Sequence, residues 1–386
     1  MMRLFLIIIF LISPGAALSL EDSVKLHLDA ATSLYLTDTC LFDGSTPDRT
    51  LLTRIRPYLT ATPSRSIFIS FAYESNLIAS NTLSASQGQA GENTRLRLAD
   101  IPREVYDDEE RALAQNLDRV FLTWYGDGVE ASLGRQPIGH GSARVFNTSD
   151  IFAPFTPQST YSEYKAGVDA VRVRKYFGID GAVELISTAH RDGAEDGYYL
   201  LRGEYSLPAV NLSAYGGFTL GAPTFAVDIA SDLGNTGIYG ECVLRTDSPV
   251  QDALRATAGG HRRFLNGVNA LAELHYNGVG EESPEKYFLA TSTREWINRE
   301  SFLLGRWYMA LSGDYQPHPL VTVGANFIGN LADGSALFQP SVKWAAFESG
   351  DSTVTLIGGG SFAMASGDGE FDNSPDTIYF EAQLSL

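Results

Sequence analysis

The sequence predicts an all-β protein, folded as a single transmembrane antiparallel β-barrel with one loop turned into its interior. Apolar and polar residues alternate in many segments of about ten residues, and these segments are spread over nearly the whole chain. Aromatic residues gather near the ends of these segments, where the interface girdles of a membrane barrel fall. Beyond the N-terminal region, no apolar run reaches the roughly 18 residues of a transmembrane helix.

The first 19 residues are typical of a secretory signal peptide. Arg3 supplies the positive charge, residues 4–12 the apolar stretch, and Ala17 and Ser19 the small residues before a cleavage site. We therefore expect residues 1–19 to be removed and residues 20–386 to form the barrel. The alternative is a membrane anchor, but this apolar stretch would span only about half of a bilayer core.

The alternation is clearest in the final segment of the chain. Ile378, Phe380 and Leu384 share one face of this segment, while Glu381 and Gln383 share the other. Soluble β-sandwiches also contain alternating strands, but their strands recur every 8–12 residues or so, whereas here the spacing is about 20. A barrel with both chain ends on one side of the membrane needs an even number of strands. We expect about 18, with 16 as the alternative.

The composition excludes several classes of function. Lys and Arg number 28 against 46 Asp and Glu, a net charge of −18, which argues against a nucleic-acid partner because such proteins need a basic surface. The two cysteines and six scattered histidines lack metal-ligand spacing, so we expect no metal and no cofactor. His140 and Ser142 have no evident acidic partner, so we expect no enzymatic activity.

Alternation also predicts which charged side chains face the interior. In Arg95-Leu96-Arg97, for example, the two arginines share the interior face, while Leu96 and Leu98 point outward. An interior lined by cations would favour anions. The alternative is that these cations pair with interior carboxylates, for which Glu74, Glu130, Glu184, Glu204 and Glu241 are available. The residues expected to line the interior are Arg54, Arg56, Arg95, Arg97, Arg172, Arg174, Arg202, Arg306, Lys343 and Glu130.

A strand, a long loop and a returning strand are expected between residues 129 and 177. Pairing residues whose numbers add up to 304 places Leu133 opposite Val171 on the outer face. Opposite charges across paired strands stabilise a register. This register gives two such pairs, Glu130 with Arg174 in the interior and Arg135 with Asp169 near the rim.

The connecting loop, residues 137–166, is rich in proline and aromatic residues and less polar than a solvent-exposed loop. Its apolar side chains require burial, and the interior of a wide barrel offers it. We therefore expect the loop to narrow or plug the barrel; the alternative is a surface loop packed on its neighbours. The residues expected to form the constriction are Arg144, Phe146, Asn147, Asp150, Phe152 and Phe155.

Three motifs in this stretch carry a family resemblance. Gly134-Arg135-Gln136, Gly139-x-Gly141 with Arg144 after it, and Asp169-Ala170-Val171-Arg172 resemble the alginate-export family of outer-membrane barrels. They equally resemble its uncharacterised porin relatives in Gram-negative bacteria. The resemblance covers about 45 residues and implies a barrel of about 18 strands and, in the exporters, an arginine-rich conduit for a polyanion.

Together these observations predict an outer-membrane channel for small or polymeric, hydrophilic and anionic solutes, narrowed by the 137–166 loop. The alternative is a non-conducting barrel that serves as a scaffold or holds a partner protein. The expected partners are outer-membrane lipid and lipopolysaccharide, the barrel-assembly machinery and the solute. The sequence leaves the oligomeric state undetermined.

Overall fold

The computed structural model describes residues 23–37, 48–81, 94–98, 110–159, 164–246, 253–364, 367–372 and 374–386, and the backbone of residues 103–107. The signal peptide expected at residues 1–19 therefore lies outside the described residues. None of the helices in the described ranges is long and apolar enough to cross a membrane.

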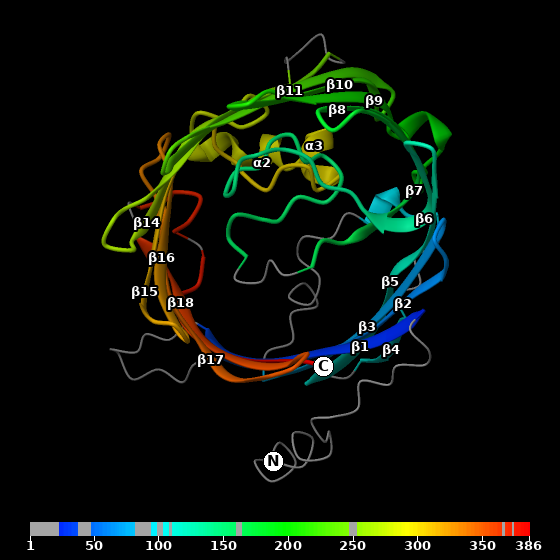
Figure 1. The fold of residues 1–386 in the computed structure, drawn as a ribbon. Coiled ribbons are helices and arrows are strands. Elements are labelled where there is room, and N and C mark those ends of the chain that lie inside the picture. Colours follow the sequence, from blue (N-terminus) through cyan, green and yellow to red (C-terminus); the bar gives the residue numbers. More distant parts are fainter. Residues whose placement is uncertain are drawn as a thin grey trace.

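Nineteen strands make up most of the described chain, and they enclose a wide interior (Figure 1). The strands are β1 (Val24–Thr37), β2 (Asp48–Ser64), β3 (Ile67–Ser80), β4 (Arg103–Asp107), β5 (Arg111–Gly126), β6 (Val129–Pro137), β7 (Gly167–Phe177), β8 (Gly181–Thr188), β9 (Tyr199–Ser206), β10 (Val210–Thr219), β11 (Ala222–Leu233), β12 (Thr236–Arg245), β13 (Ala253–Arg263), β14 (Asn269–Asn277), β15 (Trp307–His318), β16 (Val321–Asn330), β17 (Ala336–Ser349), β18 (Ser352–Met364) and β19 (Thr377–Ser385).

Eighteen of these strands form one closed antiparallel ring, as the sequence predicts. Each strand pairs with the next along the chain, except that β3 pairs directly with β5. β1 pairs with β19, from Asp29 opposite Ser385 to Thr37 opposite Thr377, and this pairing closes the ring. The short strand β4 adds to β5 alone. Closure leaves no free edge among the ring strands, so their backbone groups pair with one another.

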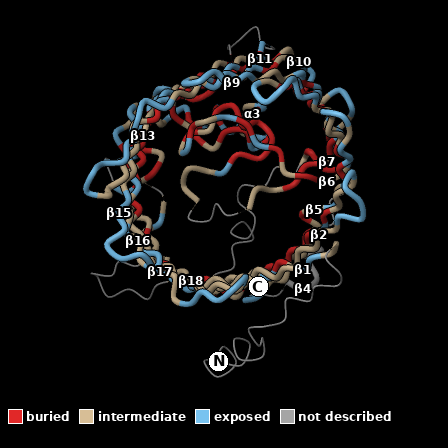
Figure 2. Tube along the Cα trace, viewed as in Figure 1, coloured by how far each residue is buried: buried red, intermediate tan, exposed pale blue. Residues whose placement is uncertain are grey.

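The two faces of the wall differ as the alternation predicts. Outward side chains are apolar and exposed, as at Leu133 (63% exposed) and Val227 (56%). Inward positions carry polar and charged groups, many of them buried beneath chain that folds into the ring. Figure 2 shows buried residues both on these inner segments and on the wall strands next to them.

The pairing of β6 with β7 has the predicted register. Leu133 stands opposite Val171, Glu130 opposite Arg174, and Arg135 opposite Asp169. The chain between these strands turns into the ring (Figure 1), so the expectation of an in-folded loop is also confirmed.

A second segment also enters the ring, between β14 and β15. It contains the three-residue turn η3 (Pro284–Lys286) and the short helices α2 (Tyr287–Ala290) and α3 (Arg294–Ile297), and Figure 1 places α2 and α3 inside the barrel. This segment was not predicted from the sequence.

The strand expected around residues 95–98 is wrong. Residues 94–96 form the three-residue turn η1 (Thr94–Leu96). Leu96, expected to point outward, is fully buried in an apolar cluster with Ile138 and Phe152 of the in-folded loop. A short sequence match to the alternating pattern is therefore not enough to define a strand.

Candidate functional site

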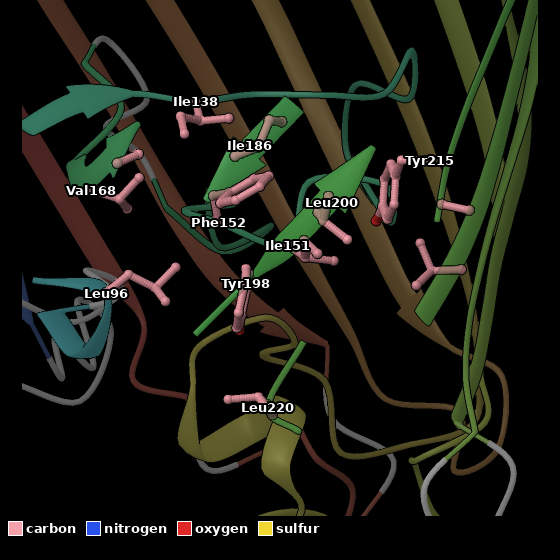
Figure 3. Close-up of a cluster of buried hydrophobic side chains, with 13 residues drawn as sticks. Leu96, Ile138, Ile151, Phe152, Val168, Ile186, Tyr198, Leu200, Tyr215 and Leu220 are labelled. Atoms are coloured by element: carbon pink, nitrogen blue, oxygen red, sulfur yellow. The ribbon is translucent and has the colours of Figure 1, made fainter. Parts of the chain in front are cut away.

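The in-folded loop packs an apolar face against the inner wall. Figure 3 shows Ile138, Ile151 and Phe152 of the loop meeting side chains of β7 to β10. The Phe152 ring lies 5.7 Å from that of Tyr198 and 5.4 Å, edge to face, from that of His140. Burial lowers the pKa of His140 and outweighs the opposite effect of the Glu184 carboxylate 3.8 Å away. The wall residues of the cluster include Val168, Ala170, Ile186, Leu200, Tyr215, Ala226 and Val243.

Phe146 belongs to a second apolar cluster, which lies farther along the barrel wall. Its ring stacks on His275 of β14 with centroids 5.1 Å apart and lies 6.0 Å from Tyr308 of β15. Phe146 is only 3% exposed. The predicted constriction residues Phe146 and Phe152 thus hold the loop to the wall, and they do not point into open space.

Carboxylates on the wall accept hydrogen bonds from the loop backbone. The Glu273 carboxylate accepts from the backbone N–H groups of Arg144 (2.7 Å), Val145 (3.1 Å) and Phe146 (2.8 Å). It also accepts from the Tyr239 hydroxyl at 2.6 Å. Three successive N–H groups that converge on one carboxylate form the concave anion site known as a nest.

Two further carboxylates continue this arrangement along the wall. Glu241 of β12 accepts from the backbone N–H groups of Thr148 (2.9 Å) and Ser149 (3.2 Å). Asp228 of β11 accepts from the Ser142 hydroxyl at 2.9 Å. Loop residues 142–149 therefore lie along β11 to β14.

The loop also reaches the opposite wall. The carbonyl oxygen of Gln158 accepts a hydrogen bond from the Gln339 side chain of β17 at 3.1 Å. The Tyr164 hydroxyl donates to Asp29 of β1 at 2.7 Å, and the Arg56 guanidinium lies 4.1 Å from the centre of the Tyr164 ring. The loop is thus attached at β11–β14, at β17 and at β1–β2, and it crosses the interior between these attachments.

The remaining predicted constriction residues occupy different positions. Asn147 accepts from the backbone N–H of Asp150 at 3.1 Å, and Asp150 forms an ion pair with Lys165. Phe155 is 38% exposed. The Arg144 side chain contacts the His261 ring nitrogen at 3.3 Å in an exposed position. Of this predicted set, Arg144 and Phe155 have the most accessible side chains.

The cations predicted for β7 and β9 are matched by carboxylates on β8 and β9. Arg172 donates to Glu184 at 2.8 Å, and Arg174 forms an ion pair with Glu204. Arg202 lies 2.5 Å from Glu204 and 3.9 Å from Glu184. The predicted neighbours Glu130 and Arg174 stand opposite each other, but the Glu130 carboxylate accepts from the Tyr176 hydroxyl at 3.0 Å.

The cations of β2 are also matched. Arg56 lies 2.7 Å from Asp118 and 3.9 Å from Asp29. Arg54 lies 3.5 Å from Glu74. Arg95 and Arg97 do not lie on a strand of the barrel wall as predicted, because they belong to the turn region around η1. There Arg95 pairs with Asp192 at 2.6 Å, and Arg97 donates to the carbonyl oxygen of Gly167 at 2.9 Å.

The predicted rim pair is an ion pair with two hydrogen bonds. The Arg135 guanidinium donates to the two carboxylate oxygens of Asp169 at 2.8 and 3.0 Å. Arg306 precedes β15 and pairs with Glu282 at 2.8 Å. Lys343 lies on β17, in line with the inward Gln339. Within the described residues, Lys343 and Arg144 have no carboxylate within 4.0 Å.

A fully buried group of charges attaches the second in-folded segment. Arg245 of β12 lies 2.6 Å from Glu295 and 2.7 Å from Glu300, and Arg255 of β13 lies 3.1 Å from Glu300. The Tyr198 hydroxyl also donates to Glu300. The sequence analysis missed this group. Alternation beside Leu244 and Leu254 could have located the two arginines, but no pattern marks their glutamate partners.

The wall from β16 to β19 has a different inner face. Gln339 contacts the in-folded loop, which shows that its side chain faces inward. The pairing register and the alternation of side chains then give the residues that share its face. Most of them are small or uncharged, including Gly324, Asn326, Ser341, Gly359, Ser361 and Gln383. Lys343, Glu348 and Glu381 are the charged exceptions in this part of the described chain.

Comparisons with solved structures give porin barrels of the same fold. The chain matches the Pseudomonas aeruginosa protein OccD3 (OpdP) with a TM-score of 0.55 and 11% identity, over 95% of this chain and 91% of that one. It matches OccAB1 of Acinetobacter baumannii with a TM-score of 0.56 and 10% identity, over 94% and 96%. A BenF-like porin from Pseudomonas fluorescens gives a TM-score of 0.56 and 11% identity, over 95% and 99%.

At these identities the likeness concerns the fold alone. No protein-family model matches the chain, and no curated protein matches it. The resemblance to porin-like barrels therefore agrees with the fold, and nothing in these comparisons supports the alginate-export label.

Proposed function

We propose that this protein is a passive channel of the bacterial outer membrane for small hydrophilic solutes. The observation that carries the proposal is a closed barrel of 18 strands with a long loop crossing its interior, the fold shared with OccD3 (OpdP), OccAB1 and the BenF-like porin. An apolar outer face and a polar interior suit a wall that separates lipid from water. A polyanion such as alginate remains an untested prediction of the sequence resemblance.

We also propose that the channel prefers anions, but we assign this preference to other residues than those predicted from the sequence. The predicted arginines of β2, β7 and β9 all have carboxylates within 4.0 Å, so their charges are largely compensated. Arg144 and Lys343 lack such a partner in the described chain. We assign the preference to these two residues, Arg144 on the loop and Lys343 on β17.

The test is single-channel conductance of the refolded protein in a planar bilayer, with a salt gradient across it. An open pore with a reversal potential that favours anions supports the proposal. The Arg144→Gln/Lys343→Gln variant should lose most of this preference, whereas Arg172→Gln should change it little. Equal effects of the two variants, or a preference for cations in the unmodified protein, would contradict the assignment.

The loop contacts at β17 and β1 favour one alternative, a barrel plugged by its own loop and acting as a scaffold or partner-holding protein. No conductance in the full chain, followed by conductance after deletion of residues 138–166, would support the plugged barrel. No conductance in either form would reject the channel and leave the scaffold.

A further inference from the structure

The carboxylates that hold the loop differ from the other buried acids of the interior. Asp228, Glu241 and Glu273 are 8%, 4% and 4% exposed. Glu184, Glu295 and Glu300 each lie within 4.0 Å of an arginine. The first three have no Arg or Lys within that distance in the part of the chain that the structure describes.

Hydrogen bonds from the loop compensate the charges of Glu241 and Glu273, whereas Asp228 receives a single bond. The loop gives Glu273 three backbone N–H groups, Glu241 two and Asp228 one hydroxyl. A buried carboxylate is stable only when donors replace its lost water, and several N–H groups can do so. The dependence is mutual, because the loop amides would also lose their acceptors if the loop moved away.

We propose that the loop masks these three wall carboxylates, so that its docking sets both the bore and the sign of the charge that the lumen presents. With the loop docked, the carboxylates are covered and Arg144, the residue that begins the Glu273 nest, projects at the loop surface. With the loop displaced, three uncompensated negative charges on β11, β12 and β14 face water in the lumen. Glu241 and Glu273 are in this sense positioning residues for Arg144.

The proposal rests on the proposed channel, so its first test does not need conduction. Hydrogen–deuterium exchange of the folded protein should show protected amides at residues 144–149. In Glu241→Gln/Glu273→Gln these amides should exchange at least about tenfold faster, because a glutamine offers one acceptor oxygen where the carboxylate offers two. The matched control is Glu381→Gln, an inward acid whose hydrogen bonds within the described residues go to Ser33 and Gln383; its loop exchange should match the unmodified protein.

Unchanged loop exchange in the double variant, with the β8–β10 amides still protected, would overturn the proposal. If the double variant does not fold, a disulfide serves instead. The Thr148 and Thr257 hydroxyl oxygens lie 2.7 Å apart, so Thr148→Cys/Thr257→Cys should cross-link readily with Cys40 and Cys242 replaced by Ala. The same cysteine pair should cross-link several-fold more slowly when Glu241→Gln is added, and an equal rate would count against the proposal.

The second test concerns the sign of the charge and applies once the unmodified protein is shown to conduct. Deletion of residues 138–166 should raise the conductance and shift the reversal potential toward cations. Adding Asp228→Asn, Glu241→Gln and Glu273→Gln to the deletion should remove this shift while the larger conductance remains. A deletion variant that keeps its anion preference, or a shift that survives the three substitutions, would refute masking while leaving the channel itself intact.

Discussion

Two parts of the same wall use polar side chains in opposite ways. From β7 to β14 the inner face carries many charges, and the buried ones are bound to another strand or to an in-folded segment. From β16 to β19 the inner face is made mostly of uncharged residues, and its described contacts with the loop are the hydrogen bond from Gln339 to Gln158 and the packing of Phe146 in the cluster that contains Ile328 and Leu337. The difference shows that charge inside a barrel does not by itself mark the path of a solute. Here most of it holds chain segments in place.

Removing a buried charge on the loop-covered side should have the largest effect on stability. Glu300→Ala leaves Arg245 and Arg255 buried, the former without one of its two acidic partners and the latter without its acid. We expect unfolding to become easier by about 3–5 kcal/mol, measured by urea denaturation in lipid vesicles. Protease sensitivity between β14 and β15 should rise at the same time. A loss below about 1 kcal/mol would mean that these charges do not hold the segment.

Truncation of an apolar side chain should cost more stability on the loop-covered side of the barrel than on the side formed by β16–β19. Ile151 is fully buried between the loop and the wall, so Ile151→Ala should cost about 2–5 kcal/mol. Ile357→Ala is the matched change on β18, where the side chain is only partly buried, and it should cost about half as much or less. Urea denaturation of both variants gives the two losses in free energy of unfolding. Equal losses would contradict the difference between the two sides of the barrel.

The segment between β18 and β19 contains a carboxyl group, that of Glu370, whose contribution to stability depends on pH. Burial raises the pKa of Glu370 from its ordinary 4.5 to about 7, and the nearby acid Asp333 also raises it. The Tyr308 hydroxyl, the Asn330 amide and the backbone N–H of Leu304 donate to this carboxyl group. Because its pKa is higher in the folded state, its contribution to stability is complete below about pH 4.5 and is lost as the pH rises through about 7.

We therefore expect the backbone around residues 367–372 to exchange hydrogen several-fold faster at pH 8.5 than at pH 5.5, after correction for the intrinsic rate. The Glu370→Gln variant should show no such dependence. If the dependence persists in that variant, another group is responsible.

An exposed ion pair should matter least. Arg306 and Glu282 lie 2.8 Å apart, but the Glu282 side chain is 76% exposed. Glu282→Ala should therefore change the free energy of unfolding by less than about 1 kcal/mol. A cost like that of Glu300→Ala would show that burial is not what separates the two kinds of ion pair.

Sequence reasoning succeeded where the evidence repeats along the chain. The register of β6 and β7 follows from the alternation of Leu133 and Val171 together with the opposite charges of Arg135 and Asp169, since all of these must agree at once. It failed at Arg95-Leu96-Arg97, where three residues match a strand by chance. It also missed the segment with α2 and α3, because no local pattern shows that Glu295 and Glu300 will meet Arg245.

The sequence by itself therefore determined the barrel, the strand alternation and the inward turn of the loop, because each depends on a period of two or on apolar residues that need burial. Only the tertiary structure decided which charges neutralise each other and which stay free. Partners such as Glu273 and Phe146 are 127 residues apart along the chain, and closure of the ring brings them together. Charge pairing depends on distance in space, and local alternation carries no record of that distance.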